Sequence, residues 1–174
     1  MFTDHTVESA PSGSRRAMEA TVARLGYLPA PVARLAESPH LLDGFLRLSG
    51  MFETTTLDPL ARETVIMTVA VRNGCHVCVA MHSAKLVEHP ELVAALREQR
   101  PLPRERLEAV RQFTLDVLAT SGNVDNATVS AFLAHGYTRQ NALEVVLGIG
   151  TYTMSTLANR LTRAPLDEQL AAFA

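Results

Sequence analysis

The chain of 174 residues has the size of one globular domain, and we expect a single hydrophobic core. Hydrophobic residues make up 47% and charged residues 20% of the chain, which excludes a disordered or fibrous protein. A formal net charge of -2, with no basic run longer than Arg15-Arg16, argues against a nucleic-acid partner. The longest nearly apolar stretch, residues 65–71, is far shorter than the roughly 20 residues that cross a bilayer, so we expect no membrane partner.

The N-terminal segment, residues 1–14, is rich in Ser, Thr, Pro and Gly and shows no helical period. We predict a mobile tail there, followed by one helical domain over residues 15–174. The segment has neither the basic nor the apolar region of a signal peptide, and the sequence therefore predicts a cytoplasmic protein. Because a reducing compartment does not favour structural disulfides, the two cysteines call for another explanation.

Apolar residues recur at helical spacing along the rest of the chain. Between residues 103 and 120, for example, Leu107, Val110 and Val117 fall on one face and Glu105 on the opposite face. No pair of alternating strands bounded by a hairpin turn is present, and the predicted class is all-α. The predicted helices lie near residues 15–25, 39–51, 59–73, 75–88, 90–99, 103–120, 125–135 and 139–161.

Proline and glycine mark the ends of these predicted helices. Proline occupies the first helical turn at three predicted starts: Ser38-Pro39, Asp58-Pro59 and His89-Pro90. Glycine stands at three predicted ends: Gly50, Gly122 and Gly136.

Two of the predicted helices are apolar on nearly all sides, at residues 60–71 and 145–157. Such a helix lies at the centre of a bundle or is covered by another subunit. Gly148 and Gly150 in the second helix would let another backbone come close. We therefore expect a homo-oligomer.

The two cysteines lie three residues apart in the motif Cys75-His76-Val77-Cys78, and His82 follows them. On a helix, Cys75, Cys78 and His82 stand at i, i+3 and i+7 and share one face. The N-terminus of a helix favours a thiolate over a thiol and lowers the pKa of the sulfur that faces it. His82 lies one turn beyond Cys78 and is placed to accept or return its proton, directly or through one water.

A carboxylate completes this group if the helices on either side of Asn73-Gly74 form an antiparallel hairpin. A residue about ten before the turn then lies level with a residue about ten after it, because both helices rise by the same amount per residue. Glu63 therefore faces the region of His82. A carboxylate inside an otherwise apolar helix is costly to bury unpaired, and we predict that His82 is its partner. The alternative is a buried salt bridge between Glu63 and an arginine.

In this arrangement Glu63 orients the imidazole of His82, and His82 acts as the base beside the thiol nucleophile Cys78. A thiolate that attacks a hydroperoxide becomes a sulfenic acid, and a neighbouring thiol such as Cys75 condenses with it to a disulfide. A dithiol reductant then restores both thiols by exchange.

The spacing of Glu63, Cys75, Cys78 and His82 resembles the signature of the alkylhydroperoxidase D family, within the carboxymuconolactone decarboxylase-like superfamily. The resemblance extends over about residues 27–160. It implies an all-α bundle built around an antiparallel helix pair that carries the CxxC motif. It also implies assembly into dimers, trimers or hexamers and thiol-dependent reduction of organic hydroperoxides.

The family pattern assigns a role to each residue of the motif. Cys78 attacks the peroxide, Cys75 resolves the product, and Glu63 and His82 form a proton relay. A dithiol, lipoyl or thioredoxin-like partner is the expected reductant, and no cofactor or metal ion is expected.

One position departs from the family pattern. The best-described peroxidases of the family carry a histidine directly before the second cysteine, where this chain has Val77. A histidine stands one position earlier, at His76, and is a possible accessory residue.

Two other functions fit the same residues. The first is a thiol-disulfide oxidoreductase that acts on a protein or lipoyl partner. The second is a helical interaction module that senses redox state or holds zinc through Cys75, Cys78 and His82. Because one helix face rarely supplies a closed tetrahedral site, we prefer redox chemistry to zinc binding.

Overall fold

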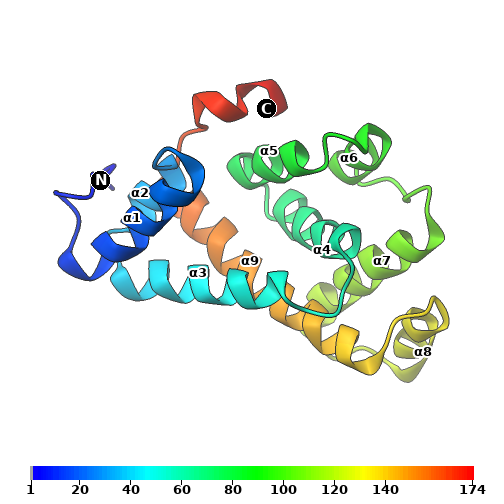
Figure 1. The fold of residues 1–174 in the computed structure, drawn as a ribbon. Helices are drawn as coiled ribbons and strands as arrows, with labels where there is room; N and C mark the ends of the chain where they lie inside the picture. The colour runs from blue at the N-terminus through cyan, green and yellow to red at the C-terminus, as the bar shows by residue number, and fades with distance from the viewer. Residues whose placement is uncertain (1) are drawn as a thin grey trace.

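The computed structural model describes residues 2–174, and this part of the chain contains helices and no strand (Figure 1). The all-α prediction is confirmed. The elements are α1 (Ser12–Leu25), α2 (Ala30–Leu35), α3 (Pro39–Glu53), α4 (Pro59–Arg72), α5 (His76–Lys85), α6 (Pro90–Arg97), α7 (Glu105–Thr120), α8 (Asn126–Ala134), α9 (Arg139–Thr162) and the 3₁₀ helix η1 (Glu168–Phe173).

Two of the three helices predicted to start at a proline have an N-cap side chain directly before it. Ser38 Oγ accepts the backbone N–H of Leu41 at the start of α3. Asp58 Oδ1 accepts the N–H of Ala61 at the start of α4. Each cap satisfies a donor that the first turn of the helix leaves without a partner. His89, before the third proline, makes no such hydrogen bond.

The structure differs from the predicted helices at several positions. Helix α3 continues through Gly50 to Glu53, because Phe52 is fully buried and extends the apolar face of the helix. Helix α2 and the 3₁₀ helix η1 were not predicted. Both are only six residues long, too short for a helical period to be visible in the sequence.

The predicted boundary between tail and domain, at residues 14 and 15, falls inside α1. Ala10 is only 2% exposed and packs in a small apolar cluster with α1, α2 and α3. Ser14 is also buried and donates a hydrogen bond to the carbonyl of Ala36 at 2.7 Å. The mobility of residues 1–14 stays a prediction.

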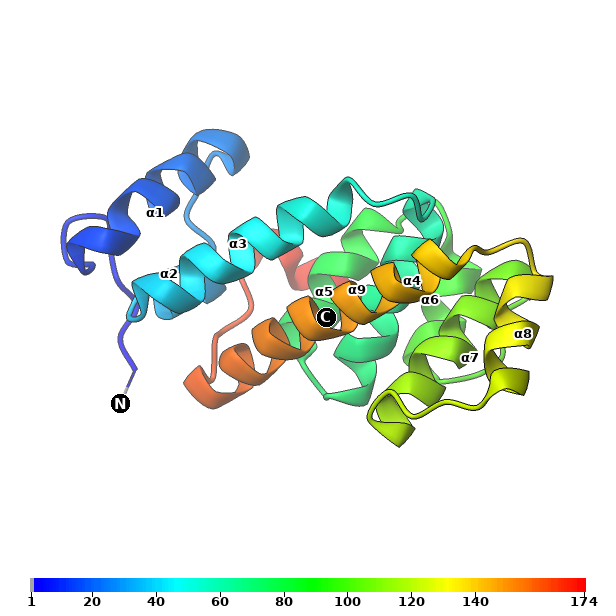
Figure 2. The same ribbon diagram turned by 90° about the horizontal axis from the view of Figure 1, so that it is seen from below.

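Helix α4 lies at the centre of the bundle. It packs against α5, α7 and α9, and every residue from Thr64 to Ala70 is buried. Figure 2 shows α9 running alongside α3 and across this central region. The predicted central position of the apolar segment at residues 60–71 is confirmed.

Helix α9 approaches its neighbours closely at Gly148. A Cβ atom at this position would lie 2.7 Å from the ring of Phe52 and 3.0 Å from Cγ1 of Val65. The neighbours that come close at Gly148 are thus the side chains of Phe52 and Val65, and not the backbone of another helix as predicted. At Gly150 no atom lies within 4 Å of such a Cβ, so this glycine faces away from the bundle.

The outer face of α9 is apolar and exposed. Leu143 is 73% exposed and Leu161 is 71% exposed, and Val146 and Leu157 lie along the same side of the helix. The expectation that another subunit covers this helix stays a prediction. No helix among the described residues is long and apolar enough to cross a membrane.

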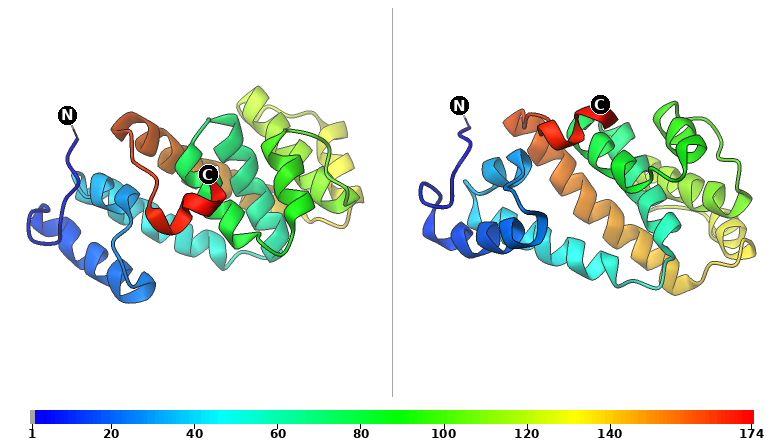
Figure 3. Two further views of the ribbon diagram at one scale, coloured as in Figure 1. Left: turned by 90° about the horizontal axis from the view of Figure 1, so that it is seen from above. Right: turned by 45° about the horizontal axis from the view of Figure 1, so that its top comes forward.

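Helices α4 and α5 form a hairpin that turns at Asn73 and Gly74. Gly74 has a φ of 63°, a left-handed conformation that favours glycine. The C-terminal segment returns past this hairpin, and η1 packs against α5 (Figure 3). The start of α5 is therefore enclosed by the α4–α5 turn, the end of α9 and the C-terminal segment.

Candidate active site

Both cysteines lie at the start of α5. Cys75 is the N-cap residue, and its Sγ accepts the backbone N–H of Cys78 at 3.4 Å. The two sulfur atoms are 2.7 Å apart, and both cysteines are free. Cys75 is 1% exposed and Cys78 is 5% exposed. The predicted CxxC pair at a helix N-terminus is confirmed as a geometric arrangement.

The surroundings of the two sulfurs separate their pKa values. The hydrogen bond with Cys78 outweighs burial and, together with the backbone N–H of Cys78, lowers the pKa of Cys75 to about 7. The same hydrogen bond and burial raise the pKa of Cys78. The negative charge of the reduced pair therefore rests on Cys75 and the proton on Cys78. The backbone N–H groups of Val77 and Cys78 at the start of α5 add to the lowering of the Cys75 pKa, but the hydrogen bond with Cys78 contributes most.

Glu63 and His82 form the predicted pair across the α4–α5 hairpin. Glu63 Oε2 lies 2.6 Å from Nδ1 of His82, and both side chains are largely buried. Burial raises the pKa of Glu63, but the hydrogen bond from His82 and the charges of His82 and Lys85 outweigh it and lower the pKa. Glu63 is therefore a carboxylate at neutral pH, and it orients the imidazole ring.

Two further residues complete this side of the site and were not predicted. Lys85 Nζ donates to Glu63 Oε1 at 3.1 Å and to Glu53 Oε1 at 3.2 Å. The ring of Tyr152 meets the ring of His82 edge to face, with centroids 5.5 Å apart. Lys85 stands three residues after His82 on α5, so helical spacing indicates it, whereas Tyr152 comes from α9 and depends on helix packing.

Asn159 brings α9 into contact with the cysteines. Its Nδ2 donates to Sγ of Cys78 at 3.3 Å across 81 positions of the chain. The residue is 5% exposed, and its Oδ1 is buried without a hydrogen-bond partner among the described residues. Asn159 falls within the helix predicted at residues 139–161, and no contact with the cysteines was predicted for it.

Two sequence-predicted residues do not join the hydrogen-bonded group. His76 is exposed at the first position of α5, and its side chain forms no hydrogen bond within residues 2–174. Val77, which precedes the second cysteine, is 1% exposed and packs with Ala70 and Ala164. No hydrogen bond joins the side chains of His82 and Cys78 in the described part of the chain.

Two pockets are lined in part by residues of the site. A pocket of about 380 Å³ is lined by Cys75, His76, Asn159, Arg160 and Arg163, among others. A second pocket, of about 410 Å³, lies at the start of α4 and the end of α5 and is lined by Glu63 and Lys85, among others.

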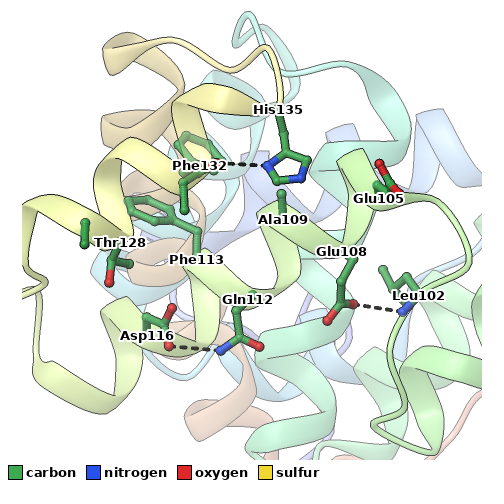
Figure 4. Close-up of a pocket in the computed structure, with 12 residues that line it drawn as sticks. Leu102, Glu105, Glu108, Ala109, Gln112, Phe113, Asp116, Thr128, Phe132 and His135 are labelled. Carbon is green, nitrogen blue, oxygen red and sulfur yellow. Dashed lines mark hydrogen bonds between the residues drawn. The ribbon is translucent and has the colours of Figure 1, made fainter.

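Another pocket, of about 690 Å³, lies between α7 and α8, and none of the site residues named above lines it. Figure 4 shows it with Phe113, Phe132 and His135, and neither cysteine contributes to its lining. Within residues 2–174, no three His, Cys, Asp or Glu side chains come together in a way that could hold a metal ion.

Residues 39–99 match the sequence model of the carboxymuconolactone decarboxylase family. This segment runs from the start of α3 to just beyond α6 and contains Glu63, both cysteines and His82. The resemblance to this group of proteins is confirmed. No protein with a curated description matches the chain.

Solved structures with the same fold include proteins described as alkylhydroperoxidase D-like. An uncharacterized peroxidase-related protein from Ralstonia eutropha JMP134, described as an alkylhydroperoxidase AhpD core, superposes with a TM-score of 0.85 at 19% identity, over 97% of this chain and 93% of that one. An uncharacterized peroxidase-related protein from Silicibacter sp. TM1040 gives 0.79 at 19% identity, over 97% and 92%. The debrominase Bmp8 gives 0.78 at 16% identity, over 99% and 95%. The chain therefore has the alkylhydroperoxidase D-like fold.

Proposed function

We propose that this protein is a thiol-dependent peroxidase that reduces organic hydroperoxides with Cys75 and Cys78. The observation that carries the proposal is the position of the two free sulfurs, 2.7 Å apart at the N-terminus of α5, with the pKa of Cys75 lowered to about 7. A thiolate near neutral pH with a second thiol in contact is the arrangement that disulfide-forming redox chemistry requires. The likeness to peroxidase-related proteins supports the same class.

The reaction begins with attack of a thiolate on the terminal oxygen of the hydroperoxide. The oxygen–oxygen bond breaks, the attacking sulfur becomes a sulfenic acid, and the alkoxide takes up a proton to leave as an alcohol. The second sulfur then attacks the first, and a disulfide and water form. The two cysteines lose two electrons and the hydroperoxide gains them. Starting from one thiolate and one thiol, the sequence takes up one proton.

We assign the handling of these protons to His82 and Glu63. His82 lies one helical turn from Cys78, and Glu63 holds its Nδ1 at 2.6 Å. Through one bridging water, the imidazole takes the proton of Cys78 when this sulfur attacks and returns it to the departing hydroxide. The carboxylate of Glu63 stabilises the imidazolium that forms in between.

The order of attack is where the structure and the family pattern point to different sulfurs. The pattern assigns the attack to Cys78. In the structure, Cys75 carries the lowered pKa and lines the pocket of about 380 Å³, whereas the pKa of Cys78 is raised. We therefore propose that Cys75 attacks first and that Cys78 resolves. A dithiol, lipoyl or thioredoxin-like partner would then reduce the disulfide by exchange.

The first experiment counts free thiols and measures intact mass before and after one equivalent of cumene hydroperoxide is added to the reduced protein. We expect both thiols to disappear and the mass to fall by two hydrogens. Two unreacted thiols would contradict peroxidase chemistry. Turnover of a dithiol substrate without peroxide would then favour the oxidoreductase, and zinc that copurifies in stoichiometric amount would favour the interaction module.

We also propose that the protein is a homo-oligomer in which a second copy covers the outer face of α9. This proposal is supported by the exposed apolar side chains of Leu143, Val146, Leu157 and Leu161 along one helix. Leu157→Glu should lower the molar mass measured by light scattering. A monomeric wild-type protein at micromolar concentration would contradict the proposal.

A further inference from the structure

The pocket beside Cys75 differs from its surroundings in charge. Its lining residues come from the α4–α5 turn, from the end of α9 and from the segment that follows α9, and they include two arginines and no Asp or Glu. We propose that this pocket binds hydroperoxides that carry a carboxylate, with Arg163 holding the carboxylate while the peroxide group meets the cysteine pair. The inference rests on the peroxidase function proposed above and names its substrate class.

Arg160 and Arg163 play different parts in this pocket. Arg160 Nη1 donates to the carbonyl of Asn73, and it lies 3.2 Å from where a Cβ atom would stand at Gly74. Arg160 is therefore committed to holding the α4–α5 turn. Arg163 is exposed, and within residues 2–174 its side chain takes part in no hydrogen bond or ion pair. Its guanidinium is free to bind an anion.

Arg163 lies where α9 ends, and it lines both this pocket and a second pocket beside Arg34. Arg163 ends α9 as its C-cap residue in a left-handed conformation, with a φ of 53°. The chain then turns toward Ala164, which packs beside the cysteines, and Arg163 and Ala164 both line the pocket. A planar guanidinium in this position offers two parallel N–H donors to one carboxylate, a geometry that an ammonium group does not match.

Asn159 also lines the pocket, and its Oδ1 is buried without a hydrogen-bond partner among the described residues. A buried acceptor without a donor is unfavourable, and a ligand that donates an O–H relieves that cost. The terminal O–H of a hydroperoxide is such a donor, and Asn159 Nδ2 already contacts Sγ of Cys78. The pocket therefore favours a ligand that has an anionic group to bind Arg163 and an O–H group to donate to Asn159. A carboxylate-bearing hydroperoxide has both.

The volume of the pocket suits this class of ligand. About 380 Å³ lies in the lower part of the range of about 300–1,000 Å³ found for small-molecule sites. After the reaction the alkoxide takes up a proton, and the product is the corresponding hydroxy acid. The carboxylate takes no part in the electron transfer, so a neutral hydroperoxide of the same shape reacts by the same steps without the anchor.

The test uses cumene hydroperoxide and its para-carboxylate as a matched pair of probes. The second-order rate constant of thiol oxidation is measured for both with the reduced full-length protein. We expect the wild-type protein to prefer the carboxylate by roughly tenfold, the scale of one charge-assisted contact. Arg163→Ala should lose this preference, so that its rate constants with the two probes differ by no more than about twofold. Arg163→Lys should keep part of the preference.

Arg139→Ala is the matched control, because it removes an exposed arginine from the opposite end of α9. Its preference should equal that of the wild-type protein, and added salt should weaken the preference in both. An equal preference in the wild-type protein and Arg163→Ala would overturn the inference and leave the peroxidase function standing. If neither probe oxidises the thiols, the peroxidase function fails and the inference fails with it.

Discussion

Among residues 2–174, charged side chains are paired in the group around Glu63 and His82, whereas the pocket beside Cys75 contains an unpaired one. On one side, Glu63, His82, Lys85 and Glu53 form a connected set in which each carboxylate has a basic partner. On the other side, the pocket contains Arg160 and Arg163 and no acidic residue. The charged groups of the first set are paired with one another. In the pocket, the guanidinium of Arg163 has no partner among the described residues and can bind a ligand.

This difference indicates a division of labour across α5. A charge that is already paired can pass a proton without attracting a ligand, because binding an ion would require breaking the existing contacts. An unpaired guanidinium beside a pocket attracts an anion. Binding this anion does not change which of the two cysteines carries the proton. We therefore expect substitutions on the first side to change proton transfer and substitutions on the second side to change substrate preference.

Removing either sulfur should have the largest effect, because both sides act through the cysteines. Cys75→Ser and Cys78→Ser should each lose disulfide formation and steady-state turnover entirely. If Cys75 attacks first, Cys78→Ser should still consume one equivalent of hydroperoxide and stop as a sulfenic acid, which trapping with dimedone and mass spectrometry would detect. A single reaction in Cys75→Ser and none in Cys78→Ser would instead support the order of the family pattern.

Breaking the paired side should slow the reaction without changing substrate preference. His82→Gln and Glu63→Gln should each lower the rate of disulfide formation by roughly 100-fold, the scale of a lost general acid–base group. His40→Gln, which changes an exposed histidine on α3, is the control and should leave the rate unchanged. A pH–rate profile that is the same in His82→Gln and the wild-type protein would show that His82 does not handle the proton.

A substitution at Gly148 should disturb both sides together. Helix α9 supplies Tyr152 to one side and Asn159 to the other, and a Cβ atom at Gly148 would meet the ring of Phe52 at 2.7 Å. Gly148→Ala should lower the free energy of unfolding by about 2 kcal/mol, the middle of the range for overpacked cores. Gly150→Ala, with nothing within 4 Å, should instead be neutral or stabilising by up to about 1 kcal/mol in urea unfolding. Equal stability of the two variants would contradict the close approach.

The charge of Glu63 should also be visible in the stability of the fold. Because its pKa in the folded protein lies below 4.5, the carboxylate stabilises the folded state above pH 4.5. This stabilisation is lost as the pH falls through the folded-state pKa. Glu63→Gln should thus cost roughly 2 kcal/mol at pH 7 and less in acid, as measured by urea unfolding. A constant difference from pH 7 to pH 3 would contradict this assignment, and Glu19→Gln, an exposed residue of α1, should show little effect at any pH.

The smallest predicted effect is a shift in the titration of Cys75. Its reaction with iodoacetamide should follow a pKa of about 7 in the wild-type protein. In Cys78→Ala this pKa should rise, because the hydrogen bond that contributes most to the shift is gone. Mass spectrometry of the alkylated protein at a series of pH values measures both curves. Coincident curves would show that Cys78 does not stabilise the Cys75 thiolate.

Local patterns in the sequence were sufficient for most of the helices and for half of the site. The prolines that follow Ser38 and Asp58 marked the starts of two helices. This could be predicted because an N-cap and the first turn of a helix involve only residues that are close in the sequence. The spacing of Cys75 and Cys78 placed both sulfurs on one face of a helix for the same reason. The pairing of Glu63 with His82 also followed, since two helices joined by a short turn keep a register that can be counted.

The sequence by itself therefore determined the helical class, the cysteine pair and its carboxylate–histidine partner. Only the tertiary structure decided that Asn159 meets Cys78, that Tyr152 meets His82 and that Arg163 opens onto a pocket beside Cys75. These contacts join α5 to a helix that begins more than fifty positions later in the chain. They depend on how α9 crosses the α4–α5 hairpin, which is set by the packing of side chains such as Phe52 against Gly148. No periodicity within a single helix carries that information.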